Sequence, residues 1–521
     1  MVNYIDKTYR HTMKTKVYFT PTSTKGKTTF KSGKNGSEEL KVLCQSAEVA
    51  GHQMNKRIDP RIFHKNTAED YLQAAIETAN WIDTLAVKTE HGRIWKALPE
   101  GQDGYREDVP MFTSKSMYDG SAGIGIFLIR LYEATSDERW LKEAEEAAAH
   151  IIATQVGSEW YQHTLHSEVK GIIPVPGWAA GAYNGPVGEA YFLEDLYQVT
   201  GKQKYRDFVL QTADVLIEAA SRDERGLFWS EQEDITADGG FIVFLDIVYR
   251  RTGIRKYLDF ASEAAERIAK DALNAPNGGK FWKLLDLSMI DFPKDTTFPN
   301  WSHGTTGTAW MFAALYQDTG KQEFLELAKV GLEYAMNISV GDEKGRLIPY
   351  QDHPVTGPTY DKYYLSTCHG PVGSTLAFRE VYEVTGEELY KNWTIELSRG
   401  IVKAGAPERH SWGFWNCQCQ CCGTAGILEH FAEMYEYTDE KEFYDYMIRT
   451  ADVLLSDSDH RTSGSRTWYD SWWRTIPTRV VSYPGLYVGA AGCGSSLLRA
   501  YAALTGKKLT NLYEYHFFEK I

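Results

Sequence analysis

One pattern recurs along the chain and constrains its fold more than any other feature. It reads G-x-x-G, then mostly apolar residues, then a tyrosine nine residues after the second glycine. The pattern occurs six times in full and once in a weaker form, Gly240-FIVFLDIVYRRTG, which keeps the second glycine. Its tyrosines are Tyr132, Tyr197, Tyr249, Tyr316, Tyr382, Tyr435 and Tyr501. Such regular spacing indicates one structural unit repeated seven times.

Each copy predicts a mostly apolar inner helix that begins at the glycines and ends near a Thr-Gly pair. Seven amphipathic stretches with helical spacing of their apolar residues predict outer helices packed on one face. These stretches cover residues 68–87, 139–155, 204–220, 256–273, 323–338, 388–405 and 442–457. The sequence therefore predicts an all-α fold, an α/α toroid with a closed double ring of seven inner and seven outer helices.

The N-terminal segment, the net charge and the lengths of the apolar stretches limit the domain organisation, the partners and the location of the protein. Residues 1–66 are polar and lack periodicity, which predicts a partly disordered arm before a toroid domain over residues 67–521. The 56 basic and 70 acidic residues give a net charge of -14, which disfavours nucleic acid as a partner. No apolar stretch is long enough to span a membrane, and the first residues lack the apolar core of a secretory signal. We therefore expect a cytoplasmic protein.

Cysteines gather in two consecutive copies of the repeat. Five of the seven lie within 55 residues, which favours metal binding over a disulfide framework. Cys368-His369-Gly370 and Cys421-Cys422-Gly423 occupy equivalent places, so the ring should bring Cys368, Cys421 and Cys422 together. Three thiolates with a fourth position open are typical of a catalytic Zn²⁺ site. The alternative is a closed zinc clip that ties one loop, made of Cys417, Cys419, Cys421 and Cys422.

The residue before each first glycine should line the mouth of the ring, where helix N-termini present unpaired N–H groups. These residues are Asp119, Asn184, Thr236, His303, His369, Cys422 and Val488. Imidazole and carboxyl groups exchange protons near neutral pH. His303 is therefore the main candidate for a general acid, with Asp119 and His369 as further candidates.

These motifs resemble the lanthionine synthetase C-like family, the zinc-dependent cyclases of lanthipeptides, over roughly residues 68–510. The family's W-C-x-G motif matches Thr367-Cys368-His369-Gly370, with Thr in place of Trp. Its C-H-G motif matches Cys421-Cys422-Gly423, with Cys in place of His, and its H-G motif matches His303-Gly304. The resemblance implies that Cys368, Cys421 and Cys422 bind Zn²⁺.

The resemblance also implies a reaction. Zinc would activate a cysteine thiol, which adds to dehydroalanine or dehydrobutyrine and forms a thioether, while His303 protonates the α-carbon. The implied partners are a dehydrated precursor peptide or a small thiol, with a separate dehydratase. The chain departs from the family at three positions. Ser116 and Gly181 stand where the family carries an Asp, and Tyr364 stands where it carries an Arg.

Other functions fit parts of the pattern. Some β-arabinofuranosidases, which are glycoside hydrolases, use an α/α toroid with zinc held by three cysteines and a Glu two residues before the isolated cysteine. This chain has Ser366 at that place. A non-catalytic zinc scaffold is a second alternative, and a relative that adds glutathione to dehydroamino acids is a third.

Overall fold

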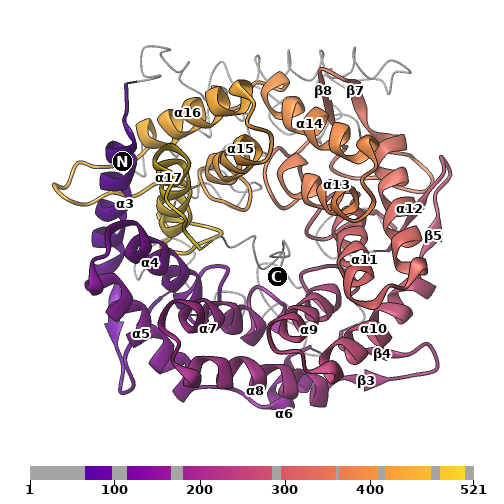
Figure 1. Cartoon of the computed structure of the whole chain (residues 1–521), viewed down its shortest axis with the longest axis horizontal. Helices are drawn as coiled ribbons and strands as arrows, with labels where there is room; N and C mark the ends of the chain where they lie inside the picture. Colours follow the sequence, from indigo (N-terminus) through magenta and orange to yellow (C-terminus); the bar gives the residue numbers. More distant parts are fainter. Residues whose placement is uncertain are drawn as a thin grey trace, which may run out of the picture.

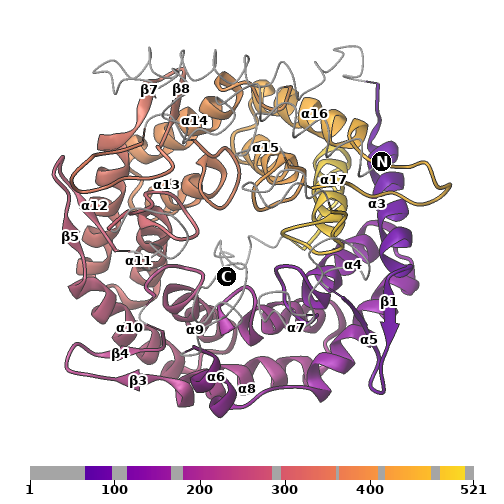
Figure 2. The ribbon, with the colours of Figure 1, turned by 180° about the vertical axis from the view of Figure 1, so that it is seen from behind.

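The computed structural model describes residues 65–96, 114–165, 180–230, 232–283, 295–359, 363–408, 417–470 and 481–510. In these residues the helices form two concentric rings, one inside the other (Figures 1 and 2). This arrangement confirms the predicted toroid. The predicted N-terminal arm lies outside the described residues except for its last two positions.

The inner ring contains one helix for each copy of the repeat. Its helices are α4 (Ser121–Thr135), α7 (Pro186–Thr200), α9 (Asp238–Thr252), α11 (Thr305–Thr319), α13 (Pro371–Thr385), α15 (Thr424–Thr438) and α17 (Ala490–Thr505). Their first ten residues or so are buried in nearly every case, because neighbours, outer helices and loops surround them. The last helix, α17, packs against α4 and closes the ring.

The outer helices bury only one face. They are α3 (Ala68–Asp83), α5 (Glu138–Ala153), α8 (Gln203–Ala219), α10 (Arg255–Lys270), α12 (Gln322–Ile338), α14 (Glu388–Lys403) and α16 (Lys441–Ser456). Except for α3, which packs mainly on α17, each packs on the inner helix that precedes it in the chain. In α10, Leu258, Ala261, Ala265 and Ile268 face the core at helical spacing and charged residues stand between them.

Short elements that the repeat pattern did not predict join outer helices to the next inner helices. Four antiparallel hairpins are β1 (Ala86–Lys88) with β2 (Arg93–Trp95), β3 (Ser221–Arg222) with β4 (Leu227–Phe228), β5 (Leu273–Asn274) with β6 (Lys280–Phe281), and β7 (Val340–Asp342) with β8 (Gly345–Leu347). One further helix, α6 (Ser158–Leu165), follows α5. Strands of two or three residues are too short to show a sequence period.

The second glycine of each motif is explained by close packing of the preceding loop. A Cβ at Gly373 would lie 2.1 Å from the carbonyl oxygen of Thr367, and a Cβ at Gly426 would lie 2.1 Å from that of Gln420. Both distances are far below van der Waals contact, so only glycine allows the loop to fold back against the first turn of its helix. This packing fixes the loops that carry the cysteines.

Candidate metal centre

Backbone hydrogen bonds join the loops that precede the inner helices into a ring around the mouth of the toroid. Each bond runs from an N–H group of one loop to a carbonyl oxygen of the next loop around the ring. The bonds are Tyr118 N to Tyr183 O (3.1 Å), Ala182 N to Thr236 O (2.7 Å), Ser302 N to Cys368 O (2.7 Å), Cys368 N to Cys421 O (3.0 Å), Cys421 N to Tyr487 O (2.9 Å) and Tyr487 N to Tyr118 O (2.8 Å). The position of Cys368 relative to Cys421 is therefore set by main-chain contacts.

Side chains make the remaining link, between the loops before α9 and α11. His303 Nδ1 lies 3.3 Å from Asp234 Oδ2 and 3.3 Å from Thr236 Oγ1. Within the described residues, no backbone hydrogen bond joins these two loops. The repeat of α9 is the degenerate one, with Ala237 where the other copies have their first glycine. The one irregular copy thus coincides with a histidine–carboxylate contact.

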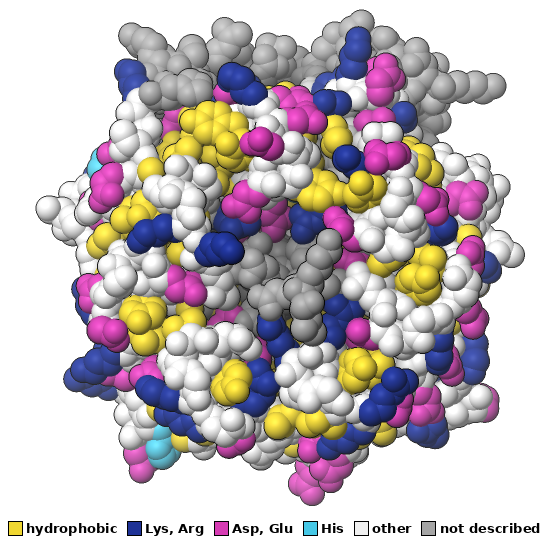
Figure 3. Space-filling view, in the orientation of Figure 1, with side chains coloured by type: hydrophobic (Ala, Val, Ile, Leu, Met, Phe, Trp, Pro, Cys, Tyr) yellow, Lys and Arg dark blue, Asp and Glu magenta, His cyan; other side chains and the backbone are white. Residues whose placement is uncertain are grey.

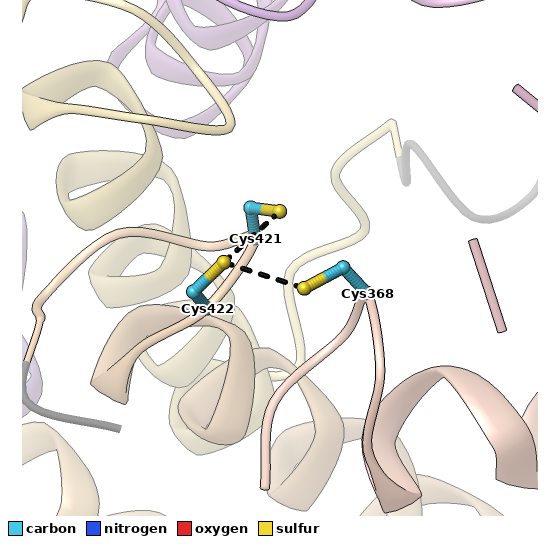
Figure 4. Close-up of side chains that lie close together, drawn as sticks. All are labelled: Cys368, Cys421 and Cys422. Atoms are coloured by element: carbon cyan, nitrogen blue, oxygen red, sulfur yellow. Dashed lines mark hydrogen bonds between the residues drawn. The ribbon is translucent and has the colours of Figure 1, made fainter. Parts of the chain in front are cut away.

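The three cysteines predicted to converge do so (Figure 4). Cys422 Sγ lies 3.3 Å from Cys368 Sγ and 3.3 Å from Cys421 Sγ. All three are free thiols, and each is 7% exposed or less. Cys368 comes from the loop before α13, whereas Cys421 and Cys422 come from the loop before α15.

This donor set fits Zn²⁺. Sulfur atoms bound at about 2.3 Å in a tetrahedral site lie about 3.8 Å apart, close to the observed separations. Burial, and then contact with Cys421 and Cys422, raises the pKa of the Cys368 thiol well above its usual range. Without a cation these buried thiols stay protonated, and a divalent cation is the group that stabilises them as thiolates. Three ligands leave a fourth position for a guest molecule.

Three tyrosines, which the sequence analysis did not single out, stand beside the cysteines. Tyr118 donates its hydroxyl proton to Cys421 Sγ at 3.0 Å. The ring of Tyr487 stacks on that of Tyr118 at 5.4 Å between centroids and meets Tyr183 edge-on at 5.5 Å. All three stand two residues before the first glycine of their repeats, the same register as Cys368 and Cys421. That register was the sequence signal for them.

A cavity of about 50 Å³ opens beside the cysteines. Each of the seven repeats contributes at least one residue to its lining. The lining residues are Tyr118, Tyr183, Asn184, Thr236, Trp301, Ser302, His303, Thr367, Cys368, Cys421 and Tyr487. Of the residues predicted to line the mouth, only Asn184, Thr236 and His303 line this cavity. The residue two positions before the glycine lines it more often, because the backbone ring directs that position inward.

The Asp234 carboxylate is fixed opposite His303. It accepts hydrogen bonds from the backbone N–H of Thr236 at 2.8 Å and from Gln232 Nε2 at 2.8 Å. Burial raises the pKa of Asp234, but the charge of His303 and these hydrogen bonds outweigh it and hold the pKa below its ordinary value. Asp234 is therefore an ionised carboxylate held in a fixed orientation against Nδ1 of His303.

Asp119 lies at the N-terminus of α4 but does not line the cavity. It is 1% exposed, and Ser116 donates its hydroxyl proton to Asp119 Oδ1. The other oxygen, Oδ2, has no hydrogen-bond partner among the residues that the structure describes. Burial raises the pKa of Asp119 to about 7. Its role as an acid stays a prediction from the sequence.

His369 also does not line the cavity. Its ring is 9% exposed and contacts Phe298, Tyr350 and Tyr364 at centroid distances of 5.0, 5.0 and 5.4 Å. The ring of His303 lies 5.5 Å away. The structure therefore brings His369 next to the main acid candidate, within an aromatic cluster that includes Tyr364.

The other cysteines of the loop before α15 form a separate group. Cys417 and Cys419 lie with Asp470, whereas Cys421 and Cys422 lie with Cys368. The four sulfur atoms of this loop do not lie in one group of mutually close ligand atoms, as a closed clip would require, although Cys419 also contacts Cys422. Cys493, at the start of α17, donates its thiol proton to Gln418 O at 3.3 Å. Burial, Asp470 and Cys417 raise the pKa of the Cys493 thiol.

The fold and the cysteine cluster together define an α/α toroid with a thiol-rich centre at its mouth. The sequence profile of the family described as lanthionine synthetase C-like protein matches residues 238–407 and 286–507, which together span just over half of the chain. The chain therefore belongs to the lanthionine synthetase C-like family. No curated protein matches it significantly in sequence.

Several solved structures match the chain, and the nisin cyclase shares its fold. A nisin cyclase matches with a TM-score of 0.54 at 13% identity, and the match covers 79% of this chain and 93% of that one. An α-1,6-mannanase variant from a Salegentibacter species matches with a TM-score of 0.43 at 14% identity, over 84% and 99% of the two chains. An unsaturated glucuronyl hydrolase specific for heparin matches with a TM-score of 0.44 at 11% identity, over 85% and 99%. None of the described helices is both long and apolar enough to cross a membrane.

Proposed function

We propose that the protein adds a thiol to a dehydroalanine or dehydrobutyrine residue and forms a thioether. The supporting observation is that Cys368, Cys421 and His303 line one cavity, with Asp234 against His303. Zn²⁺ held by Cys368, Cys421 and Cys422 would bind the thiol and lower its pKa. The cavity of about 50 Å³ admits the end of a side chain, which suits a thiol or a vinylidene group.

The reaction is a net addition of S–H across C=C. The thiolate sulfur forms a bond to the β-carbon, and the electron pair of the double bond moves to the α-carbon and the adjacent carbonyl. His303 then gives a proton to the α-carbon, and the proton lost by the thiol restores the imidazolium. Asp234 faces Nδ1, so we assign the proton transfer to Nε2 of His303. No oxidant or reductant is needed.

The proposed reaction restricts the partners. It consumes a dehydroamino acid and makes none, so we propose that a separate dehydratase supplies the dehydrated peptide. The attacking thiol belongs to the same peptide or to a small thiol such as glutathione. We propose a cytoplasmic site of action, because the reaction needs reduced thiols and reduced ligands.

The glycosidase alternative lacks its carboxylate ligand in the described residues. Ser366, at the equivalent position, is buried and donates its hydroxyl proton to Gly423 O at 3.0 Å, and the group around Cys368 contains no acidic residue. The hydroxyl joins the two cysteine loops instead of supplying a metal ligand. We therefore prefer thiol addition.

The test is a coupled measurement of product and metal. The full chain, loaded with Zn²⁺, is incubated with a dehydroalanine peptide that carries one cysteine, and separately with the same peptide lacking cysteine plus glutathione. Mass spectrometry with thiol alkylation separates cyclised from glutathione-bearing product. Addition that stops on zinc chelation supports the proposal. A metal-loaded protein inactive on both substrates would leave a zinc scaffold as the better description, and hydrolysis of a nitrophenyl arabinofuranoside would favour the glycosidase.

A further inference from the structure

We propose that Cys417, Cys419 and Asp470 bind a second Zn²⁺ ion in a closed, structural site, distinct from the centre at Cys368. Their ligand atoms all lie within 4.8 Å of one another. The three residues are 2%, 0% and 1% exposed. None of them lines the cavity described above. This site is independent of the proposed thiol addition.

The backbone brings the ligands together from two distant segments. Cys417 and Cys419 stand in the loop before α15, and Asp470 stands in the chain between α16 and α17. Asp470 pairs with Val481 through two backbone hydrogen bonds of 2.9 and 3.0 Å. The backbone N–H of Gln418, between the two cysteines, donates to Asp470 Oδ1 at 2.6 Å. The carboxylate is thus held against the same stretch that carries both thiols.

A fourth ligand is available from a third element. The Cys493 side chain is fully buried in the first turn of α17, and its Sγ lies 3.3 Å from the carbonyl oxygen of Gln418. A rotation of this side chain exchanges that weak hydrogen bond for a metal bond. The set then becomes three thiolates and one carboxylate, a tetrahedral donor set with no open position.

The chemistry of the donors selects the metal. Thiolates are soft ligands that favour Zn²⁺ over Mg²⁺ or Ca²⁺, which take oxygen ligands. A buried carboxylate beside thiols is costly unless a cation neutralises it. Metal binding at Cys417 replaces the weak hydrogen bond that its thiol donates to the carbonyl oxygen of Cys422 at 3.4 Å.

Zinc stoichiometry of the full chain tests this inference. The wild type, saturated with Zn²⁺ under reducing conditions and then desalted, should hold two zinc ions per chain by elemental analysis. Cys368→Ala should retain one, and Cys419→Ser and Asp470→Asn should each retain one. Asp459→Asn is the matched control, because Asp459 lies in the same chain segment but pairs with Arg461. It should retain two.

Cobalt substitution adds a readout that does not depend on variants of the second site. In Cys368→Ala, one Co²⁺ bound through Cys417, Cys419 and Cys493 should still give thiolate-to-cobalt charge-transfer absorption. A wild type with one zinc and a Cys368→Ala variant with none would overturn the second site. So would a disulfide between Cys417 and Cys419 in protein purified without oxidant. One zinc in both the wild type and Cys368→Ala, with none in Cys419→Ser, would refute the first centre and leave the second in place.

Discussion

The cysteines of the loop before α15 have two different surroundings only a few residues apart. Cys421 faces a cavity that His303 and three tyrosines also line. Its thiol lies close to those of Cys422, in the same loop, and Cys368, in the loop before α13. Cys417 and Cys419 are buried with Asp470 and do not line the cavity. Figure 3 shows charged side chains of both signs around the hollow of the ring on one face of the molecule. Under our two proposals, the difference separates thiols that take part in the reaction from thiols that support the loop.

The largest effect should follow loss of a cavity-facing thiol. Cys368→Ala should lower the rate of thiol addition by about a thousandfold or more, because a metal ion supplies several kcal/mol of transition-state stabilisation. Circular dichroism should show unchanged helix content, because the backbone bonds of Cys368 do not need its side chain. If this variant unfolds, the first centre has a structural role instead of a catalytic one.

His303→Asn should have the next largest effect. Loss of a general acid lowers rates by about a hundredfold or more. Asparagine retains a polar side chain beside Asp234 but cannot deliver the proton. Protonation of the α-carbon should become the rate-limiting step in the variant, which a slower reaction in deuterium oxide than in water would show. An unchanged rate with bound zinc would remove His303 from the mechanism.

Asp234→Asn should have a smaller effect, about tenfold to a hundredfold, as for other residues that orient a functional group. The variant should lower kcat with little change in KM, because Asp234 contacts His303 and does not line the cavity. Steady-state kinetics with a dehydroalanine peptide measure both constants. A change confined to KM would indicate a binding role for this pair.

Asp119→Asn should change stability as a function of pH. Burial raises the pKa of Asp119 from 3.8 to about 7. Between these values the native state keeps a proton that the unfolded state has lost, so native stability falls as pH rises from 3.8 to about 7. The difference in Tm between the variant and the wild type should therefore be a few degrees more favourable to the variant at pH 8 than at pH 5. A fall in turnover of more than tenfold would instead establish Asp119 as a catalytic residue.

The repeat made most of the fold predictable. Six glycine pairs, the single matching glycine of the seventh copy and seven tyrosines fix the starts and ends of the inner helices, and helical spacing fixes the outer ones. The equivalent places of Cys368 and Cys421 predicted their convergence for the same reason. The hairpins were not predictable, because each strand has only two or three residues. Asp234 was not singled out either, because its copy of the repeat is the degenerate one and has no first glycine to align on.

The sequence by itself determined the ring, its sevenfold order and the three thiols that meet at its mouth, because each depends on spacing along the chain. The tertiary structure alone decided which side chains face the cavity, since that depends on the backbone bonds that link one loop to the next. It also paired Asp234 with His303 and Asp470 with Cys419, contacts that depend on the direction of individual side chains, which spacing along the chain does not give.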